Sequence, residues 1–394
     1  MIPIPTGIVP LRSLSTDDVL YGDRVTSYRW EVLAHGATSD SLVGYLDGVV
    51  DGSASLSWSL FAAVKGSGNM KVADLESAQP GLVTIGDVPL QSARLRPVLV
   101  IEGLPEIPLG MYVPSAAPEE WSGTGRVFSL ELLDRSTVLD QDRTEQSYTV
   151  SATTPILQAV ASVIASAGEW ITVDAQVTTT PSAPLVWPAG TSKLQIVNDL
   201  LAALNYNSLW VDGVGAFRAT PYVVPARRSP TYELLNDVER ELIDGETSIY
   251  SQEWSRDLDM FSVPNKVIAV QAGSGDATPL TGQYSNTDPY SPFSFPSRGR
   301  WITSVLDNVE TPSGTAPEVT AFLESKAQQS LIAQSAVQAT VSVKHLPVPI
   351  RVSDVMRFAN APAGIDARHV VTSVKLAATP LGLMETTLQE VIDL

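Results

Sequence analysis

The chain has 394 residues, 44% of them hydrophobic, with a formal net charge of −18 and no cysteine. This length exceeds what one ordinary hydrophobic core organises, so we expect two or three domains, and the apolar content excludes a disordered chain. The lack of cysteine excludes disulfides, thiolate metal sites and cysteine nucleophiles. The negative charge argues against a surface that binds nucleic acid.

The first segment, residues 1–22, is predicted to be an irregular arm. Pro3, Pro5 and Pro10 forbid a regular helix there and fit poorly in a central strand. The segment begins with neither a basic region nor an apolar stretch, so we expect no signal peptide. No apolar run in the chain reaches the ~18 residues that a membrane-spanning helix needs.

A β-rich domain is predicted over residues 23–145. Its clearest strand is Ser53–Leu60, where apolar side chains from Ala54 to Leu60 alternate with serines and therefore share one buried face. Turn signals recur about every 10–15 residues, which favours a sandwich or barrel over βαβ units. The other strands expected here are Val25–Leu33, Ser41–Val50, Arg94–Ile101, Leu109–Pro114 and Arg126–Leu133.

An α+β insert domain is predicted over residues 146–230. Thr154 before Pro155 indicates the start of a helix that Gly168 ends. Ser192 and Gln195 form a capping box for a second helix, which Asn205 can end. Asp212-Gly213 predicts a hairpin turn between strands Ser208–Val211 and Gly215–Ala219, and Pro221, Pro225 and Pro230 mark a linker.

A second β-rich domain is predicted over residues 231–394. It contains one helix, about residues 315–333, which begins with a capping box at Thr315 and Glu318. Residues 272–300 are rich in Gly, Ser, Pro and Asp and are predicted to form a long loop of the kind that is usually functional. The expected strands are Asn265–Gln271, Val337–His345, Val352–Phe358, His369–Ala377 and Met384–Val391.

Catalytic and cofactor-binding patterns are missing from the sequence. The three histidines, His35, His345 and His369, have no partner at metal-ligand spacing, and there is no Walker loop, Rossmann glycine pattern or calcium loop. We therefore predict no catalytic residue, no metal, no cofactor and no enzymatic activity. A glycan hydrolase that uses Glu119 or Glu120 with a distant acid stays open, although adjacent residues of a strand point to opposite faces and do not converge.

Aromatic residues offer a second alternative, a carbohydrate-binding module that recognises a host cell-wall glycan. Trp121, Trp187 and Trp301 border loops and are its candidate stacking surface. Tyr290 and Phe293 lie in the predicted long loop and are further candidates for contacts with a glycan or a protein partner.

Several segments, taken in order, resemble the minor tail or baseplate-hub proteins found at the tail tip of tailed phages. In Val127–Leu139 an apolar strand is followed by Asp134 and, five residues later, by Leu139. Thr191–Ala219 resembles the helix and strand–turn–strand of that family. The other matching segments are Leu109–Pro114, Pro155–Ala167, Trp254–Val270, Leu346–Pro349 and Val352–Val355.

This resemblance implies a mainly β (α+β) fold, with two tail-tube-like β-barrel domains flanking a smaller α+β insert. It also implies a homotrimeric hub in the virion, assembled in the host cytoplasm. The implied partners are a distal tail or tail-tube protein, a fibre, spike or receptor-binding protein, and a tape measure protein. DNA would pass through the ring without specific binding, which suits the acidic composition.

Overall fold

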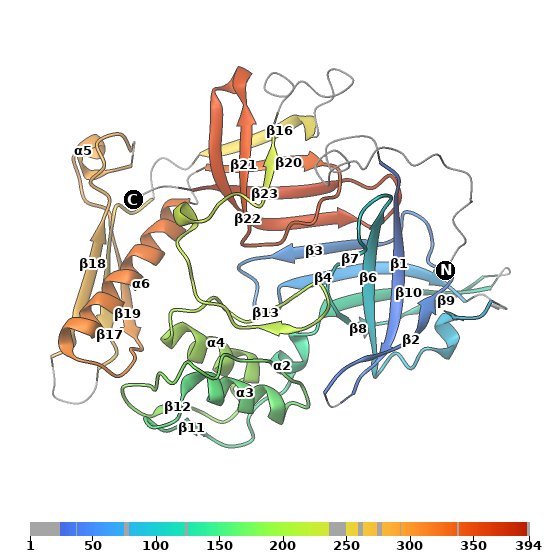
Figure 1. Cartoon of the computed structure of the whole chain (residues 1–394), viewed down its shortest axis with the longest axis horizontal. Coiled ribbons are helices and arrows are strands. Elements are labelled where there is room, and N and C mark those ends of the chain that lie inside the picture. The colour runs from blue at the N-terminus through green and yellow to red at the C-terminus, as the bar shows by residue number, and fades with distance from the viewer. Residues whose placement is uncertain are drawn as a thin grey trace.

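A computed structural model describes residues 24–36, 38–74, 79–122, 125–235, 250–258, 263–273, 278–291, 293–336 and 339–391. The protein is mainly β with a smaller helical part, as predicted (Figure 1). The predicted arm, residues 1–22, lies outside the described residues. None of the described helices is both long enough and apolar enough to cross a bilayer.

The largest sheet joins the first and last thirds of the chain. Over the described residues it contains 16 strands, and its main path runs β16-β20-β23-β22-β3-β4-β10-β8-β6-β1-β2-β5. Its strands from the first third are β1 (Thr26–Ala34), β2 (Ser41–Leu46), β3 (Ser55–Ser59), β4 (Gly66–Ala73), β5 (Leu82–Val83), β6 (Ala93–Ile101), β7 (Ile107–Pro108), β8 (Tyr112–Ala116), β9 (Glu119–Ser122) and β10 (Gly125–Asp134). Those from the later part of the chain, of which β15 and β16 precede its last third, are β15 (Tyr232–Leu234), β16 (Tyr250–Leu258), β20 (Ala339–His345), β21 (Val355–Asn360), β22 (Ile365–Ala377) and β23 (Met384–Glu390).

Strands β3 and β22 make the connection between the two thirds. They pair antiparallel, with Leu56 opposite Leu376 and Trp58 opposite Val374. Leu56 and Leu376 are buried in one core cluster that draws residues from both thirds. The predicted alternation in Ser53–Leu60 is therefore present, but Trp58 is only half-buried because it lines a cavity. The main path of the described strands ends at β16 and β5, and β7, β9, β15 and β21 branch from it without closing it, so the two-barrel arrangement stays a prediction.

The predicted insert has its own core. It contains α2 (Thr137–Gln141), β11 (Tyr148–Val150), α3 (Ile156–Ser166), β12 (Leu185–Trp187), α4 (Lys193–Ala203), β13 (Trp210–Val211) and β14 (Phe217–Arg218). Helices α3 and α4 bury their apolar faces against each other in a second cluster. The Ser192 cap of α4 is confirmed, since its hydroxyl accepts a hydrogen bond from the Gln195 N–H at 3.2 Å. Helix α3 begins one residue later than expected, because Pro155 is the extended residue that precedes it.

A third unit, which we call the αβ lobe, consists of β17 (Lys266–Gln271), β18 (Thr281–Ser285), α5 (Phe295–Arg298), β19 (Thr303–Val309) and α6 (Ala316–Ala336). Helix α6 packs on the three-stranded sheet β18-β17-β19, where Val267, Ala269, Leu323 and Leu331 are buried. The predicted capping box of α6 forms in part: the Glu318 carboxylate accepts hydrogen bonds from the Thr315 N–H at 2.7 Å and from the Thr315 hydroxyl at 2.9 Å.

The prediction of a long loop over residues 272–300 is wrong in part, because β18 and α5 lie within it. Strand β18 has the sequence TGQYS, which lacks apolar alternation. Its Gly282 lies directly under α6, and a Cβ there would be 2.4 Å from the Glu324 backbone nitrogen. A residue without a side chain is therefore needed at position 282 to leave room for the backbone of α6. The same requirement disturbs the alternation of apolar side chains from which strands are predicted.

Short 3₁₀ turns complete the described elements at Ile85–Asp87, Pro225–Arg227 and Ala361–Ala363. The second of these lies in the predicted linker. It is followed by β15, which pairs in parallel with β21 and so fastens the end of the linker to the large sheet.

Candidate functional site

The aromatic candidates fall into two classes, exposed and buried. Tyr290, Trp121 and Trp301 expose 93%, 73% and 43% of their surface. Trp187 and Phe293 expose only 8% each, so the prediction that they are surface contacts is wrong for the isolated chain. The Trp187 indole N–H donates a hydrogen bond to the Asp199 carboxylate at 2.8 Å, and the Phe293 ring lies 4.7 Å beneath the Arg298 guanidinium.

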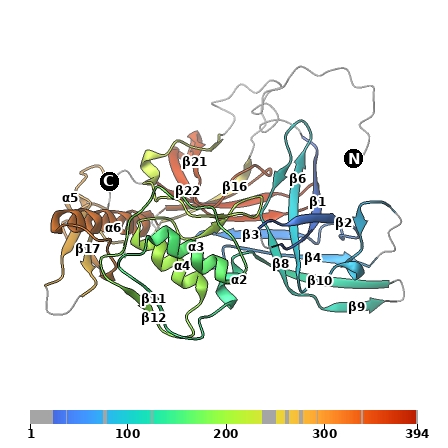
Figure 2. The same cartoon turned by 60° about the horizontal axis from the view of Figure 1, so that its bottom comes forward.

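The three tryptophans predicted to form a glycan platform do not share a surface. Trp121 is on β9, Trp187 is on β12 in the insert, and Trp301 precedes β19 in the αβ lobe. Figures 1 and 2 both place β9 and the αβ lobe at opposite ends of the molecule. A single stacking platform is therefore absent from this arrangement.

The candidate catalytic carboxylates do not converge. Glu119 and Glu120 are neighbours on β9, so their side chains point to opposite faces of the strand. Glu119 accepts a 3.4 Å hydrogen bond from Arg126 on the adjacent strand β10. Within the described residues there is also no group of three or more His, Asp or Glu side chains arranged to hold a metal ion.

Two of the histidines are buried in the large sheet. His345 contacts the Leu346 carbonyl through Nδ1 and the Thr386 hydroxyl through Nε2, each at 2.7 Å. Burial lowers the pKa of His345 to about 4, and burial likewise lowers the pKa of His369. Both rings therefore stay neutral near pH 7 and act as structural hydrogen-bonding groups.

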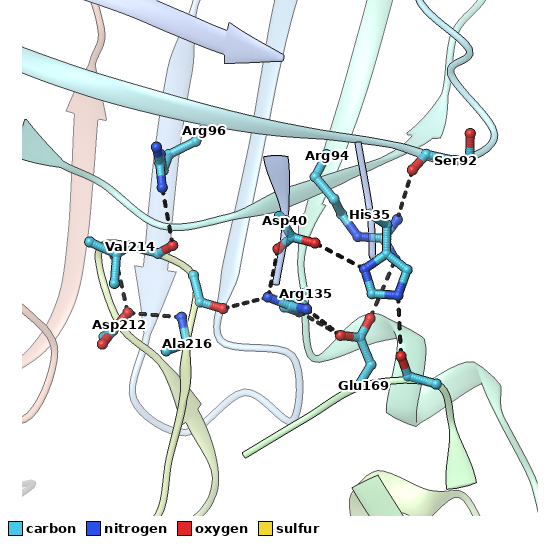
Figure 3. Close-up of polar contacts among 12 residues, drawn as sticks. His35, Asp40, Ser92, Arg94, Arg96, Arg135, Glu169, Asp212, Val214 and Ala216 are labelled. Carbon is cyan, nitrogen blue, oxygen red and sulfur yellow. Dashed lines mark hydrogen bonds and ion pairs between the residues drawn. The ribbon is translucent and has the colours of Figure 1, made fainter. Parts of the chain in front are cut away.

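A buried polar cluster lies where the large sheet meets the insert, and Figure 3 shows Arg135 at its centre. We call it the polar junction: His35, Asp40, Arg94, Arg135, Glu169 and Trp170. Arg135, which directly follows β10, is fully buried. Its guanidinium donates to Glu169 at 2.7 Å, to Asp40 at 2.9 Å and to the Gly215 carbonyl at 2.9 Å.

The other members of the junction hold the same two carboxylates. Arg94 of β6 reaches the second oxygen of Glu169 at 3.3 Å. The His35 ring contacts Asp40 at 3.0 Å and the Gly168 carbonyl at 3.2 Å, and it stacks on Trp170 at 5.7 Å. The Arg135 guanidinium also contacts Trp170 and lies 4.0 Å from the centre of its ring. Each buried charge therefore has an opposite charge and hydrogen bonds, which burial requires.

A tight hairpin brings the insert to this junction. The Asp212 carboxylate accepts hydrogen bonds from the Val214 and Ala216 N–H groups, at 3.1 and 2.9 Å. Gly215 has a left-handed φ of 94°, and its carbonyl is the one that Arg135 binds. The predicted hairpin is confirmed, and its function is visible only in the fold: it presents a backbone oxygen to the buried arginine that follows β10 of the large sheet.

The residues on either side of Arg135 explain the motif noted in the sequence. The Asp134 carboxylate accepts hydrogen bonds from the Gly66 N–H and from the Ser136 N–H and hydroxyl, and burial raises its pKa. Leu139, five residues on, is buried in the core of the insert. This segment thus turns the chain from the sheet into the insert. The sequence pattern singles out Asp134 and Leu139 but not Arg135, whose only signal is a charge placed directly after an apolar strand.

A cavity of about 280 Å³ lies beside this turn, between the large sheet and the insert. Its walls include Trp58, Lys65, Trp210, Arg351 and Met384. Lys65 donates to the Leu60 carbonyl at 2.9 Å, and the Arg351 guanidinium lies 5.7 Å from the Trp210 ring. Both of these cationic side chains therefore have partners within the fold.

Comparison with known proteins identifies the architecture. No protein-family model matches the chain, and no curated protein matches its sequence. Among solved structures, it is similar to the tail protein from Neisseria meningitidis MC58, with a TM-score of 0.60, 13% identity, and coverage of 92% of this chain and 97% of that one. It is also similar to the 43 kDa tail protein of prophage MuSo2 from Shewanella oneidensis, with a TM-score of 0.57, 12% identity and coverage of 92% and 98%.

A third similar structure is the prophage tail protein gp18 from Listeria monocytogenes EGD-e, with a TM-score of 0.53, 12% identity and coverage of 91% and 94%. The predicted resemblance to phage tail proteins is thus confirmed at the level of the fold.

Proposed function

We propose that this chain is a structural, non-enzymatic component of a phage tail tip. The observation that carries the proposal is that the fold similarity to tail proteins runs through nearly the whole of this chain and of theirs. The similarity therefore concerns the whole architecture and is not limited to a single domain of a larger, different protein. The polar junction supports a mechanical role, because its buried charged groups bind one another and thereby join the large sheet to the insert.

The domain organisation belongs to the same proposal. Residues 23–145 and 231–394 form tail-tube-like β-barrel domains, and 146–230 form the insert between them. The separate buried cluster of the insert supports its division from the β domains, whereas the αβ lobe forms a further cluster within residues 231–394. The core shared by β3 and β22 supports a tight association of the two β domains.

The proposed assembly is a homotrimeric hub at the distal tip of the tail. The main path of the described large sheet ends at β16 and β5, and such ends are covered when identical subunits close into a ring. A distal tail or tail-tube protein binds on one side, a fibre, spike or receptor-binding protein on the other, and a tape measure protein reaches the channel. The net charge of −18 lets DNA pass along the channel wall without binding specifically.

Mass measurement by light scattering, followed by negative-stain imaging of the same fraction, tests this proposal. The expected result is a trimer with a central hole, for the chain alone or mixed with its distal tail protein. A chain that stays monomeric at high concentration and forms no ring with any tail partner contradicts it. Imaging of intact virions labelled through a tag on this chain should place the label at the tail tip.

Glycan binding is the alternative function, and the exposed Trp121 and Trp301 are the residues on which it can be tested. Because the two residues lie at opposite ends, each would act as a separate site. Binding to wall polysaccharide that Trp301→Ala or Trp121→Ala abolishes would support it. The hydrolase alternative has no converging carboxylates in its favour, and wall-lytic activity that survives Glu119→Gln with Glu120→Gln would refute that assignment.

A further inference from the structure

The cavity between the large sheet and the insert has a deep part and a rim. Tyr112, Val374 and Met384 belong to its wall and are buried in the large sheet. Pro349 and Arg351 also belong to its wall and are exposed. The wall therefore runs from the core of the sheet to the surface, which gives a small molecule a way in.

Apolar side chains on this wall are incompletely covered by the fold. Trp58 lies on the apolar face of its strand, where Ala54 and Leu56 expose only 3% and 1% of their surface, yet Trp58 itself is half-buried. The other half-buried apolar residues that pack on the two core clusters and line the cavity are Ile107, Leu109, Val211, Ile350 and Val352. The cavity is therefore a gap in the apolar packing between the core of the sheet and the core of the insert.

Basic groups on the wall are already bound. The wall carries three basic and three acidic side chains, so its formal charges cancel. The Lys65 ammonium and the Arg351 guanidinium are held by a backbone carbonyl and by an indole ring, respectively. The Arg228 guanidinium donates a hydrogen bond to the Ser353 carbonyl at 2.6 Å. None of the three is therefore left to attract an anion by itself.

The carboxylates on the wall are bound as well. Asp134 accepts hydrogen bonds within the turn that follows β10. Asp212 accepts them from the N–H groups of its own hairpin and from Arg218 at 2.7 Å. Asp354 accepts one from the Arg351 N–H at 2.9 Å. A charged ligand would thus lose its hydration here without finding a free opposite charge, whereas a neutral apolar one loses little.

The volume of the cavity sets the size of the ligand. An engineered apolar cavity of about 150 Å³ is known to bind benzene, which has six carbon atoms. The cavity described here has a volume of about 280 Å³. It therefore has room for roughly ten non-hydrogen atoms, which is the size of a two-ring aromatic molecule.

We propose that this cavity binds a small neutral molecule with a flat apolar ring system of about the size of indole. Trp58, Met111 and Met384 offer it the aromatic and thioether contacts that such rings prefer. The bound ring fills the gap between the two cores and so contacts both the large sheet and the insert. This site goes beyond the proposed role in a phage tail tip and does not depend on it.

Methionine methyl groups report on binding in the full chain. The chain has six methionines, of which Met111 and Met384 line the cavity. Met70 and Met356 are buried in the large sheet but do not belong to the wall. Titration of indole into protein with isotope-labelled methionine methyl groups should shift the Met111 and Met384 signals saturably. The Met70 and Met356 signals should change little, because the ring current of an aromatic ligand acts only at close range.

A larger side chain on the wall should exclude the ligand. Ile350→Trp should weaken indole binding about tenfold or more, because a close-packed interior has no room for both rings. Leu109→Trp, at a second half-buried wall position, should do the same. The matched control is Leu346→Trp, since Leu346 is 37% exposed and lies outside the wall, and it should leave the affinity unchanged. Circular dichroism establishes that each variant is folded.

A pair of one-ring probes tests the chemical class. Benzyl alcohol should bind about tenfold or more tightly than benzoate, because a buried carboxylate finds no free cation on this wall. Tighter binding of benzoate would overturn the assignment to neutral ligands. Saturable indole binding that both tryptophan variants leave unchanged would overturn the site. Met111 and Met384 signals that do not respond to indole up to its solubility would overturn it as well, while the hub proposal is decided separately by mass and imaging.

Discussion

Replacing Arg135 with methionine is the sharpest test of the polar junction. The substitution keeps much of the side-chain volume but removes the charge that Glu169 and Asp40 both bind. The side chain of Glu169 is 0% exposed and that of Asp40 is 5% exposed, so neither carboxylate can recover its hydration without a local opening. Breaking a buried pair by removing one partner costs about 3–5 kcal/mol, and we expect a loss in that range.

A second substitution separates charge from packing. Glu169→Gln in the Arg135→Met background removes the main unpaired carboxylate, and it should return part of the lost free energy. Glu169→Gln alone should be destabilising, because Arg94 would lose the Glu169 carboxylate and Arg135 would keep Asp40 as its carboxylate partner. The two changes should thus be strongly non-additive, as expected for residues in one network.

The assay has to report on the insert, because a chain of this length need not unfold in one step. Native-state hydrogen exchange of the α3 and α4 amides gives the free energy of local opening for this region. The matched control is Arg143→Met, since Arg143 is an exposed arginine that donates to the Gly190 carbonyl at 2.9 Å. If Arg135→Met changes insert exchange no more than Arg143→Met does, the junction does not hold the insert and the reasoning is refuted.

Three further predictions concern other parts of the fold. The neutral His345 ring should stabilise the protein fully above pH about 6.5, and this contribution, about 3 kcal/mol, should be lost as the pH falls toward 4, because the unfolded chain takes up a proton there that the folded chain resists. Urea titrations from pH 4 to 8 should show this slope in wild type and a shallower one in His345→Gln. Gly282→Ala should destabilise the αβ lobe by about 1–3 kcal/mol, because its Cβ would collide with the α6 backbone, whereas Gly273→Ala, which meets nothing within 4 Å, should be nearly neutral by thermal denaturation. Trp187→Ala should cost about 3–5 kcal/mol in insert stability by hydrogen exchange, and an unchanged stability would show that the ring is not a core residue.

Elements with a local cause were predictable. The caps at Ser192 and Thr315 and the turn at Asp212 each depend on side chains within three or four residues of the backbone groups they bind. The mainly β character followed from strands whose buried faces alternate in the sequence. The resemblance to phage tail proteins came from the order of such elements along the chain, and this order can be followed in the sequence alone.

Elements with a distant cause were missed. The sequence predicts a loop in place of strand β18, because the glycine at position 282 is required by the close approach of α6, some forty residues later in the chain. The sequence predicts an exposed Trp187, because the Asp199 carboxylate that accepts a hydrogen bond from its indole N–H lies on a different element, α4. Arg135 attracted no attention because its partners, Asp40, Glu169 and Gly215, are 34 to 95 residues away.

The sequence by itself determined where helices and turns begin, which strands have a buried face, and that no catalytic group stands at a recognisable spacing. Only the tertiary structure decided which strands pair, which aromatic rings are exposed, and which buried charges meet. The physical reason is that caps and turns are satisfied within one turn of the chain. A buried ion pair or a strand register is instead fixed by whichever distant segment excludes water from it.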